Sequence, residues 1–249
     1  MYQFFIEDEN AAEDFVTIEG SDVNHIKNVL RMKPGEKIRV CTRSGQNYFC
    51  SISDVAESFV RADILEKEAE STELPCRIYL FQGLPKNDKM EWIIQKTVEL
   101  GVYEVIPVAM KNCVVKLDDK KAKSKVTRWQ AIAESAAKQS KRSLIPEVKM
   151  PMSYKEAVAY AKELDVKLVP YENEHGMAGT KAAMEQIKKG ESIAVFIGPE
   201  GGFAPEEIAL VQDEMQLITL GKRILRTETA GIAALAILGY QLESSDMIE

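Results

Sequence analysis

The sequence has no pattern typical of a membrane span, a metal site or an export signal. No apolar run approaches the ~20 residues of a transmembrane helix. The first residues, MYQFFIEDEN, turn acidic without a basic region followed by an apolar one, so no signal peptide is expected. The cysteines are Cys41, Cys50, Cys76 and Cys113, with no C-x-x-C spacing and no histidine close by. Isolated thiols are typical of a reducing compartment, so the sequence predicts a cytoplasmic protein without a bound metal or a membrane contact.

The sequence has fewer basic than acidic residues, but the basic residues are concentrated in two segments. The net charge is −7, which by itself argues against a nucleic-acid partner. Residues 111–149 nevertheless hold eleven Lys or Arg against four Asp or Glu, and residues 25–43 hold six against Glu36 alone. Basic stripes on an acidic protein can still bind phosphates. The two segments are interpreted either as nucleic-acid contacts or as solvated charged surfaces.

The first part of the chain predicts a small β-barrel-like domain. The predicted strands are residues 15–18, 37–42, 47–52 and 59–65. They alternate or are rich in β-branched side chains, and turn signals separate them. A helical piece at 25–32 interrupts them, and the polar, acidic stretch 66–75 is typical of a linker. We therefore place a first domain at residues 1–70.

Residues 71–249 predict an α/β domain. The expected strands are 77–84, 102–110, 166–172, 192–197 and 216–220, and the expected helices are 90–100, 126–142, 154–164, 181–190, 205–215 and 228–243. Alternation of strands and helices indicates a mostly parallel sheet covered on both faces. Periodicity alone would give an open, Rossmann-like sheet, with a ligand beyond the carboxyl ends of the strands.

Two turns at such strand ends carry unusual residues. The first, GPEGGF, holds Gly198, Gly201 and Gly202, which permit positive φ and close approach of a ligand to the backbone. It lacks the Lys-Ser/Thr pair of a P-loop. Glu200 and the acids that open the next helix would repel a phosphate. The turn therefore favours a neutral or cationic ligand, unless it is only a tight turn.

The second turn, LGKRILRTETAG, combines apolar and basic side chains. Ile224 and Leu225 follow Gly221 and could wall an adenine, while Arg223 and Arg226 could face an anion. The alternative is that the apolar pair belongs to the core and the arginines are solvated. Neither turn is specific by this argument alone.

The last helix is apolar almost all the way round. Its sequence, TAGIAALAILGY, is rich in Ala and Gly and too short to span a bilayer. Such a helix must be buried on every side, either centrally or in a dimer interface. Small residues allow close helix approach, which favours the interface.

Together the two turns resemble the signature of the RsmE family, bacterial 16S rRNA uracil-N3 methyltransferases of the SPOUT class. The stretches HIKNVLRMKPGE, KMEWIIQKTVELGV and RWQAIAESAAKQSKR are also similar, so the likeness runs from about His25 to Ala233. The usual serine after GPEGGF is here Ala204, which weakens a helix cap and puts no chemistry in doubt.

The resemblance implies a fold, a cofactor and partners. It implies a PUA-like RNA-binding barrel at 1–70 and a SPOUT domain with a deep trefoil knot at 71–249. It also implies S-adenosylmethionine as methyl donor, 16S rRNA of the small ribosomal subunit as substrate, and a homodimer with its active site at the interface. The implied cofactor-binding residues are Glu172, Ile197, Gly198, Pro199, Glu200, Gly201, Gly202, Leu220, Gly221, Ile224, Leu225 and Arg226.

Methylation of uracil N3 requires loss of its proton. Arg226, beside the cofactor turn, is the expected stabiliser of the developing uracil anion. Glu200 or Glu228 is the expected proton acceptor, and the alternative for Glu228 is a purely structural role at the helix start. The expected RNA-binding residues are Lys27, Arg31, Lys33, Arg43, Lys121, Lys123, Lys125, Arg128, Lys138, Lys141 and Arg142.

Two other functions remain open at this level. A related SPOUT enzyme that methylates a tRNA ribose would share the fold and the cofactor. A non-catalytic RNA-binding assembly factor would keep the barrel with a dead pocket.

Overall fold

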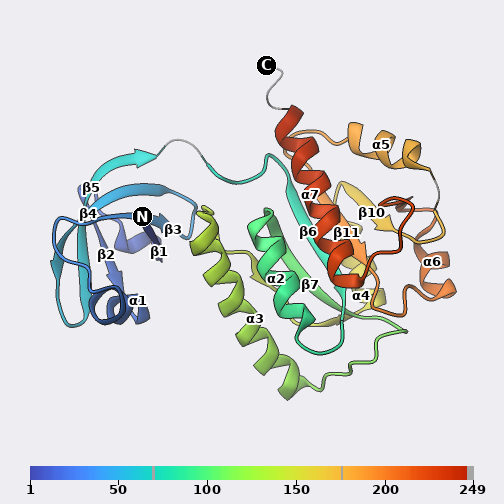
Figure 1. Cartoon of the computed structure of the whole chain (residues 1–249), viewed down its shortest axis with the longest axis horizontal. Helices are drawn as coiled ribbons and strands as arrows, with labels where there is room; N and C mark the ends of the chain where they lie inside the picture. Colours follow the sequence, from blue (N-terminus) through green and yellow to red (C-terminus); the bar gives the residue numbers. More distant parts are fainter. Residues whose placement is uncertain (69–70, 175, 246–249) are drawn as a thin grey trace. The chain divides into compact units, whose positions relative to one another are not determined.

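The chain forms two compact units. Figure 1 shows the whole chain, coloured along the sequence from blue at the N-terminus to red at the C-terminus. The structure is a computed structural model, and it describes residues 1–68, 71–174 and 176–245. One unit consists of Met1–Glu73 with Ala137–Ile145, and the other of Leu74–Ala136 with Pro146–Glu249. The first unit thus takes in a short segment from the middle of the chain, which the sequence did not indicate.

A curled five-stranded sheet makes up the first unit. Its strands are β1 (Tyr2–Ile6), β2 (Phe15–Glu19), β3 (Lys37–Thr42), β4 (Asn47–Val55) and β5 (Phe59–Glu68), in the order β1-β3-β4-β5-β2. The four predicted strands are present. Strand β1, which pairs in parallel with β3, was not predicted. Phe4, Ile18, Ile38 and Ile52 lie at or below 2% exposure in one apolar core.

The predicted helical piece of this unit is irregular. It consists of α1 (Ser21–Asn24) followed directly by the π-helical turn η2 (His25–Leu30). Arg31 ends the turn in the left-handed region at φ 54°. Ile26 is fully buried beneath it, while Lys27 and Val29 are exposed. π-Helical turns are rare in proteins, and those that occur are often found at functional sites.

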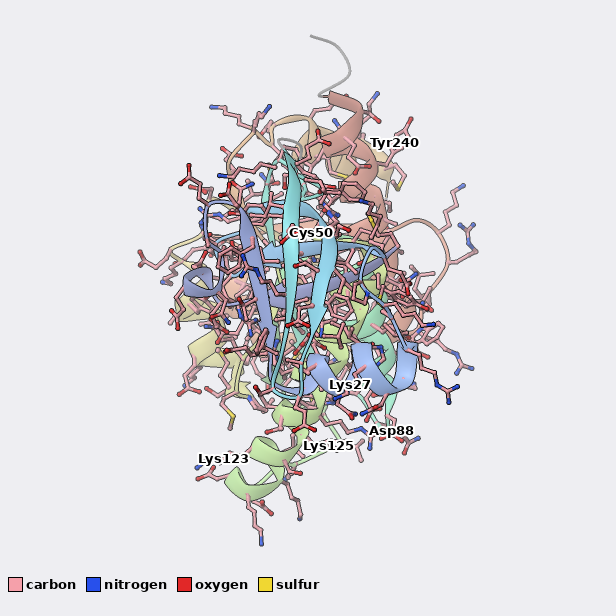
Figure 2. All side chains as sticks on the ribbon, turned by 90° about the vertical axis from the view of Figure 1, so that its left-hand side faces the viewer. Lys27, Cys50, Asp88, Lys123, Lys125 and Tyr240 are labelled. Atoms are coloured by element: carbon pink, nitrogen blue, oxygen red, sulfur yellow. The ribbon has the colours of Figure 1, made fainter. Side chains whose placement is uncertain are left out.

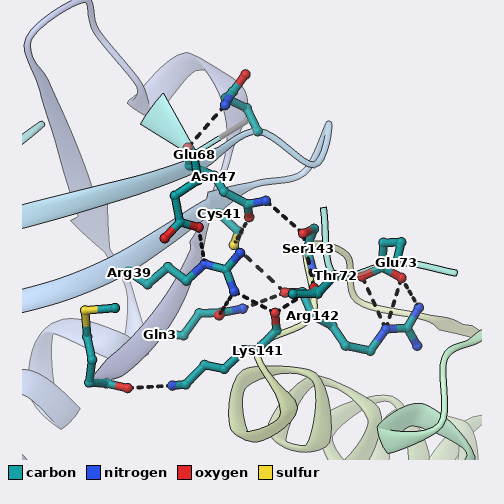
Figure 3. A network of polar contacts seen from close by, with 12 residues as sticks. Gln3, Arg39, Cys41, Asn47, Glu68, Thr72, Glu73, Lys141, Arg142 and Ser143 are labelled. Carbon is teal, nitrogen blue, oxygen red and sulfur yellow. Dashed lines mark hydrogen bonds and ion pairs between the residues drawn. The ribbon is translucent and has the colours of Figure 1, made fainter. Parts of the chain in front are cut away.

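A buried polar network holds residues 137–145 in the first unit (Figure 3). The Arg142 guanidinium is 3% exposed and forms an ion pair with Glu73. Arg39 donates to the Lys141 carbonyl at 2.7 Å and to Glu68 at 2.6 Å. Asn47 donates to the Ser143 hydroxyl at 2.8 Å. Because each of these groups is paired, the segment is joined to the barrel by satisfied hydrogen bonds.

The second unit is built on a parallel sheet. Its strands are β6 (Arg77–Gly83), β7 (Val102–Ala109), β8 (Glu147–Val148), β9 (Met152–Ser153), β10 (Val166–Pro170), β11 (Ser192–Ile197) and β12 (Gln216–Ile218). The order is β12-β10-β11-β6-β7-β8, with β9 also paired to β7, and all pairs are parallel. The predicted parallel sheet is confirmed. Its central strands are buried on both faces, as crossover helices require.

Helices cover both faces of this sheet. They are α2 (Lys89–Glu99), α3 (Asp119–Ser140), α4 (Tyr154–Ala161), α5 (Met177–Glu185), α6 (Pro205–Val211) and α7 (Thr227–Ser245). Side chains of α4 and α6 share a core with Tyr79 and Phe81, and the Phe81 and Phe196 rings stack with centroids 4.3 Å apart. On the opposite face, α7 contacts α2, β6 and β11. No helix in the described part of the chain is long and apolar enough to cross a membrane.

The final helix is not the central helix of one alternative, and its favoured place in a dimer interface stays a prediction. Only one side of α7 is buried, through Ala234, Leu235, Leu238 and Leu242. Ala236 is exposed and Tyr240 is 76% exposed on the other side. The apolar composition therefore does not reflect a helix surrounded within one chain. It leaves an uncovered apolar stripe.

Candidate active site

Three loops meet at the carboxyl ends of β10, β11 and β12. Strands β10 and β12 pair directly, and β10 also pairs with β11. A cavity of about 130 Å³ lies at this edge. Its walls are Pro170, Tyr171, Glu172, Glu174, Thr219, Leu220, Gly221, Lys222, Arg223, Ile224, Leu225 and Ala230. The structure thus gathers five predicted cofactor residues around one cavity, namely Glu172, Leu220, Gly221, Ile224 and Leu225.

The glycine-rich loop adjoins this cavity through close backbone packing. A Cβ at Gly202, whose φ is 67°, would lie 2.9 Å from a Glu172 carboxylate oxygen. A Cβ at Gly83, at the end of β6, would lie 2.7 Å from the Pro199 nitrogen. Asn112 donates to the carbonyls of Gly201 and Gly202 at 3.0 and 3.2 Å. A side chain at Gly83 would displace the loop, because it would meet the Pro199 nitrogen and ring. At Gly202 the positive φ is what favours glycine, because the Glu172 carboxylate could move aside.

A carboxylate occupies the start of the helix behind the loop. Glu207, 6% exposed, accepts from the Ala204 amide and from the Lys111 amide, both at 2.8 Å. Its charge is placed where a phosphate would otherwise sit on the helix N-terminus. This agrees with the sequence argument that the loop does not cradle a phosphate.

The second turn is joined to the first by a buried hydroxyl. Thr227, at the start of α7, donates to the Gly198 carbonyl at 2.7 Å. Gln82, fully buried at the end of β6, donates to Thr227 at 2.9 Å. Neither Gln82 nor Thr227 was among the predicted site residues. Their position at the same strand ends is the signal that could have suggested them.

The outer part of this turn faces away from the core. Ile224 is 89% exposed, Leu225 is half-buried and Arg226 is exposed. Within the described residues the Arg226 guanidinium has no hydrogen bond or ion pair. It is therefore free to meet an anionic group. Ile224 borders the cavity, but its exposure shows that the side chain is not part of the core.

The two predicted proton acceptors share one cation. The Lys89 ammonium lies 3.0 Å from Glu200 Oε1 and 3.2 Å from Glu228 Oε2. The Lys86 amide also donates to Glu200 Oε1 at 3.1 Å. Partial burial opposes ionisation of Glu200, but the Lys89 and Lys86 hydrogen bonds outweigh it and hold the pKa of this carboxyl below its usual range. Hydrogen bonding to Glu200 raises the pKa of Lys89.

The expected RNA-binding residues divide into free and paired groups. Lys27, Arg31, Lys33 and Lys123 are exposed, and their side chains have no ionic partner in the described ranges. Lys121, Lys125 and Arg128 form ion pairs with Asp118, Asp88 and Glu91, and Arg43 pairs with Glu7. Lys138 pairs with Asp22, and Lys141 donates to the Met1 carbonyl. Figure 2 labels Lys123 and Lys125 on the first half of α3 and Lys27 on the barrel.

Arg142 does not fit the expected RNA surface. Its guanidinium is buried against Glu73, so it has no surface to offer a phosphate. The sequence count treated it as one more charge of a basic stripe. Its partner lies 69 residues earlier in the chain, a pairing that local sequence does not show.

Comparison with known proteins identifies two domains. The RNA methyltransferase domain family matches residues 72–239, and the RNA methyltransferase PUA domain family matches residues 18–65. Ribosomal RNA small subunit methyltransferase E of Bacillus subtilis is 39% identical over 250 residues, covering 98% of both chains. The protein of the same name from Mesomycoplasma hyopneumoniae is 37% identical, covering 93% of this chain and 96% of that one.

A solved structure agrees with these sequences. The Neisseria gonorrhoeae ribosomal RNA small subunit methyltransferase E, bound to S-adenosyl methionine, is 32% identical with a TM-score of 0.83. The alignment covers 96% of each chain.

A PUA-like domain joined to a SPOUT-type α/β domain defines the class as an RNA methyltransferase. The chain belongs to the ribosomal RNA small subunit methyltransferase E family. The resemblance to the RsmE family, and the fold expected from it apart from the knot, are confirmed.

Proposed function

We propose that the protein transfers the methyl group of S-adenosylmethionine to N3 of a specific uridine in the 16S rRNA of the small ribosomal subunit. The observation that carries this proposal is the cavity formed by the loops after β10 and β12, with the glycine loop against Glu172. The names of its relatives, and the cofactor bound to one of them, support the substrate and the donor.

The residues present suit this cofactor. Its sulfonium and ammonium are cationic and it has no phosphate, which matches Glu172 and Glu174 at the cavity and Glu207 at the helix start. Leu220 and Leu225 give apolar surface for an adenine ring. When bound, the cofactor supplies an electrophilic methyl group. We assign the rest of the predicted set, Ile197, Gly198, Pro199, Glu200, Gly201, Gly202 and Arg226, to the rim of this pocket.

Side chains of the protein then accept the uracil proton and stabilise the negative charge that its loss creates. Breaking the N3–H bond leaves an electron pair on N3, which takes the methyl group as the methyl–sulfur bond breaks with its electrons left on sulfur. The unpaired Arg226 guanidinium stabilises the uracil anion that forms. Glu200 and Glu228 are the carboxylates available for the proton, and Glu228 has the freer oxygen. Orientation of N3 supplies a further part of the rate.

The target uridine must be unpaired or extruded, because N3 lies on the Watson–Crick edge. We assign RNA contact to the free cations of each unit, Lys27, Arg31 and Lys33 on the barrel and Lys123 on α3. Lys121, Lys125 and Arg43 join them by exchanging exposed carboxylates for phosphates, because exposed ion pairs are weak. Arg128 is a secondary candidate, because its partner Glu91 is only 17% exposed. Lys138 and Lys141 are secondary candidates.

We further infer a homodimer with the active site at its interface, a knot, and a cytoplasmic location. The uncovered stripe of α7 supports the dimer, because it begins beside the second turn and is apolar. The segment after β12 supports the knot. It leaves the edge of the sheet and returns to its centre, where Thr227 contacts Gly198 and Gln82. A ribosomal RNA substrate supports the location.

The deciding experiment is methyl transfer in vitro to small subunits from an unmethylated strain, with nucleoside mass spectrometry of the product. The expected product is N3-methyluridine at one position of the small-subunit RNA. A ribose-methylated nucleoside, or methylation of tRNA alone, would identify the related SPOUT activity instead. Calorimetry without heat on addition of S-adenosylmethionine would indicate a non-catalytic RNA-binding factor.

A further inference from the structure

One cation, Lys89, joins three segments of the second unit. Lys89 opens α2 shortly after the end of β6, Glu200 lies in the glycine loop, and Glu228 lies in the first turn of α7. The ammonium lies 3.0 Å from the Glu200 carboxylate and 3.2 Å from the Glu228 carboxylate. No expected site residue lies on α2, so the contact adds a new segment to the site.

The three side chains are partly buried, so water screens their charges less than it would at the surface. Their side chains are 28%, 25% and 18% exposed for Lys89, Glu200 and Glu228. Two carboxylates this close to one point repel each other, and the ammonium between them offsets that repulsion. Loss of Lys89 would therefore leave the two carboxylates in mutual repulsion and weaken the link between the glycine loop and the start of α7, which the Thr227–Gly198 hydrogen bond would still join.

The two carboxylates are not equivalent. Glu200 Oε1 accepts from both Lys89 and the Lys86 amide, and Oε2 lies 3.4 Å from the same amide. A carboxylate engaged in this way is a poor base. Glu228 Oε2 faces Lys89, whereas Oε1 has no partner among the described residues. Glu228 therefore keeps an oxygen for a proton.

We propose that Lys89 is a positioning residue for methyl transfer, which fixes the glycine loop through Glu200 and directs Glu228 toward the substrate. Glu200 then braces the loop, and Glu228 accepts the N3 proton. This inference rests on the proposed function.

The test compares variants of the full-length protein. The variants are Lys89→Met, Lys89→Arg, Glu200→Gln and Glu228→Gln, with Lys96→Met as the control. Lys96 lies on the same helix, is 29% exposed and pairs only locally with Glu99. The measurements are the Kd for S-adenosylmethionine by calorimetry and kcat on small subunits.

Lys89→Met should raise the Kd roughly tenfold or more, because it removes charged contacts to both segments. Lys89→Arg should recover most of the affinity, and Lys96→Met should match the wild type. Glu200→Gln should raise the Kd, because the neutral amide loses the charged contact to Lys89, and it should lower kcat by less than Glu228→Gln does. Glu228→Gln should lower kcat about 100-fold or more with an unchanged Kd.

Two results would overturn the inference. Wild-type Kd and kcat in Lys89→Met would remove its positioning role. A loss of kcat in Glu200→Gln equal to that in Glu228→Gln, at unchanged Kd, would make Glu200 the base. If the wild type bound the cofactor without methylating small subunits, the proposed function would fail. The positioning role would then stand or fall on the Kd of Lys89→Met.

Discussion

The Thr227 hydroxyl donates to the Gly198 carbonyl at 2.7 Å and so connects the two turns that the sequence singled out. Because Gln82 donates to the same hydroxyl from the central strand β6, the connection is anchored in the sheet. Gln82 is fully buried and Thr227 is 5% exposed, so water does not substitute easily for either bond.

Replacing Thr227 by Val should weaken both the fold and the pocket. The change keeps the shape but leaves the Gly198 carbonyl without the Thr227 donor, at about 1–3 kcal/mol, and removes one of the two acceptors of the Gln82 amide. Urea denaturation measures the stability, and calorimetry measures the Kd for S-adenosylmethionine. Thr227→Ser, which keeps the hydroxyl, should remain close to the wild type. Equal behaviour of the Val and Ser variants would show that the hydroxyl is not needed.

Replacing Arg226 by Ala should strongly slow methyl transfer while the cofactor still binds. Removal of one stabiliser of a developing anion costs about 100- to 1,000-fold in kcat. Because this guanidinium is unpaired, the substitution breaks no hydrogen bond or ion pair among the described residues. Arg223→Ala, at another exposed arginine of the same turn, is the control. Undiminished turnover in Arg226→Ala would remove the residue from the mechanism.

Charge reversal on the first half of α3 should weaken RNA binding. The triple variant Lys121→Glu, Lys123→Glu, Lys125→Glu should flatten the salt dependence of binding by about 0.7–0.9 for each phosphate that no longer meets a cation. The matched control reverses Lys155, Lys162 and Lys181, where one cation is likewise free and two are paired. Filter binding across a salt series measures the slope. If both triple variants change it equally, only net charge matters.

Replacing Arg142 by Met should destabilise the first unit. The change leaves Glu73 sheltered without its cation, at a cost of about 3 kcal/mol or more in the free energy of unfolding. The control is Arg43→Met, because the Arg43–Glu7 pair is half exposed and should contribute below about 1 kcal/mol. Urea denaturation distinguishes the two. A loss of RNA affinity at unchanged stability would return Arg142 to the RNA surface.

A charge on the uncovered face of α7 should dissociate the proposed dimer. Figure 2 shows Tyr240 projecting from this helix, and Ala236 lies one turn before it. Ala236→Arg would place a cation inside an apolar interface, where an unpaired charge is costly. Sedimentation of wild type and variant gives the oligomeric state. Leu210→Arg, on α6, is the control because Leu210 is also exposed, at 48%. A monomeric wild type would contradict the dimer directly.

Local pattern predicted the regular elements of the second unit well. The buried side of α2 consists of Met90, Ile93, Ile94, Thr97 and Val98, which are the residues that helical spacing selects. Gly101 follows it with φ 92°, as expected of a helix-ending glycine. Helix α3 begins at Asp119, earlier than predicted, because its first turns are mostly charged and show no apolar periodicity.

Features that depend on distant partners were not predictable in this way. Strand β1 is recognisable only through its pairing with β3. For the candidate site, the sequence indicated both turns but not Lys89, Gln82 or Thr227. Their roles arise from contacts across more than 100 residues. Glycine and charge patterns mark where a site lies, whereas long-range hydrogen bonds decide what holds it in place.

Helix α3 starts in one unit and finishes in the other, and Arg142 and Ser143 beyond its end complete the interior of the barrel. The residues that form the barrel unit are thus not contiguous in the sequence. An exchange of residues 1–73 between relatives would transfer Glu73 and Asn47 but leave their partners behind. Recombination could preserve the barrel only if both pieces were exchanged together or already matched. Residues 137–145 thus lie within the range matched by the RNA methyltransferase domain family and at the same time supply interior contacts of the PUA-like unit.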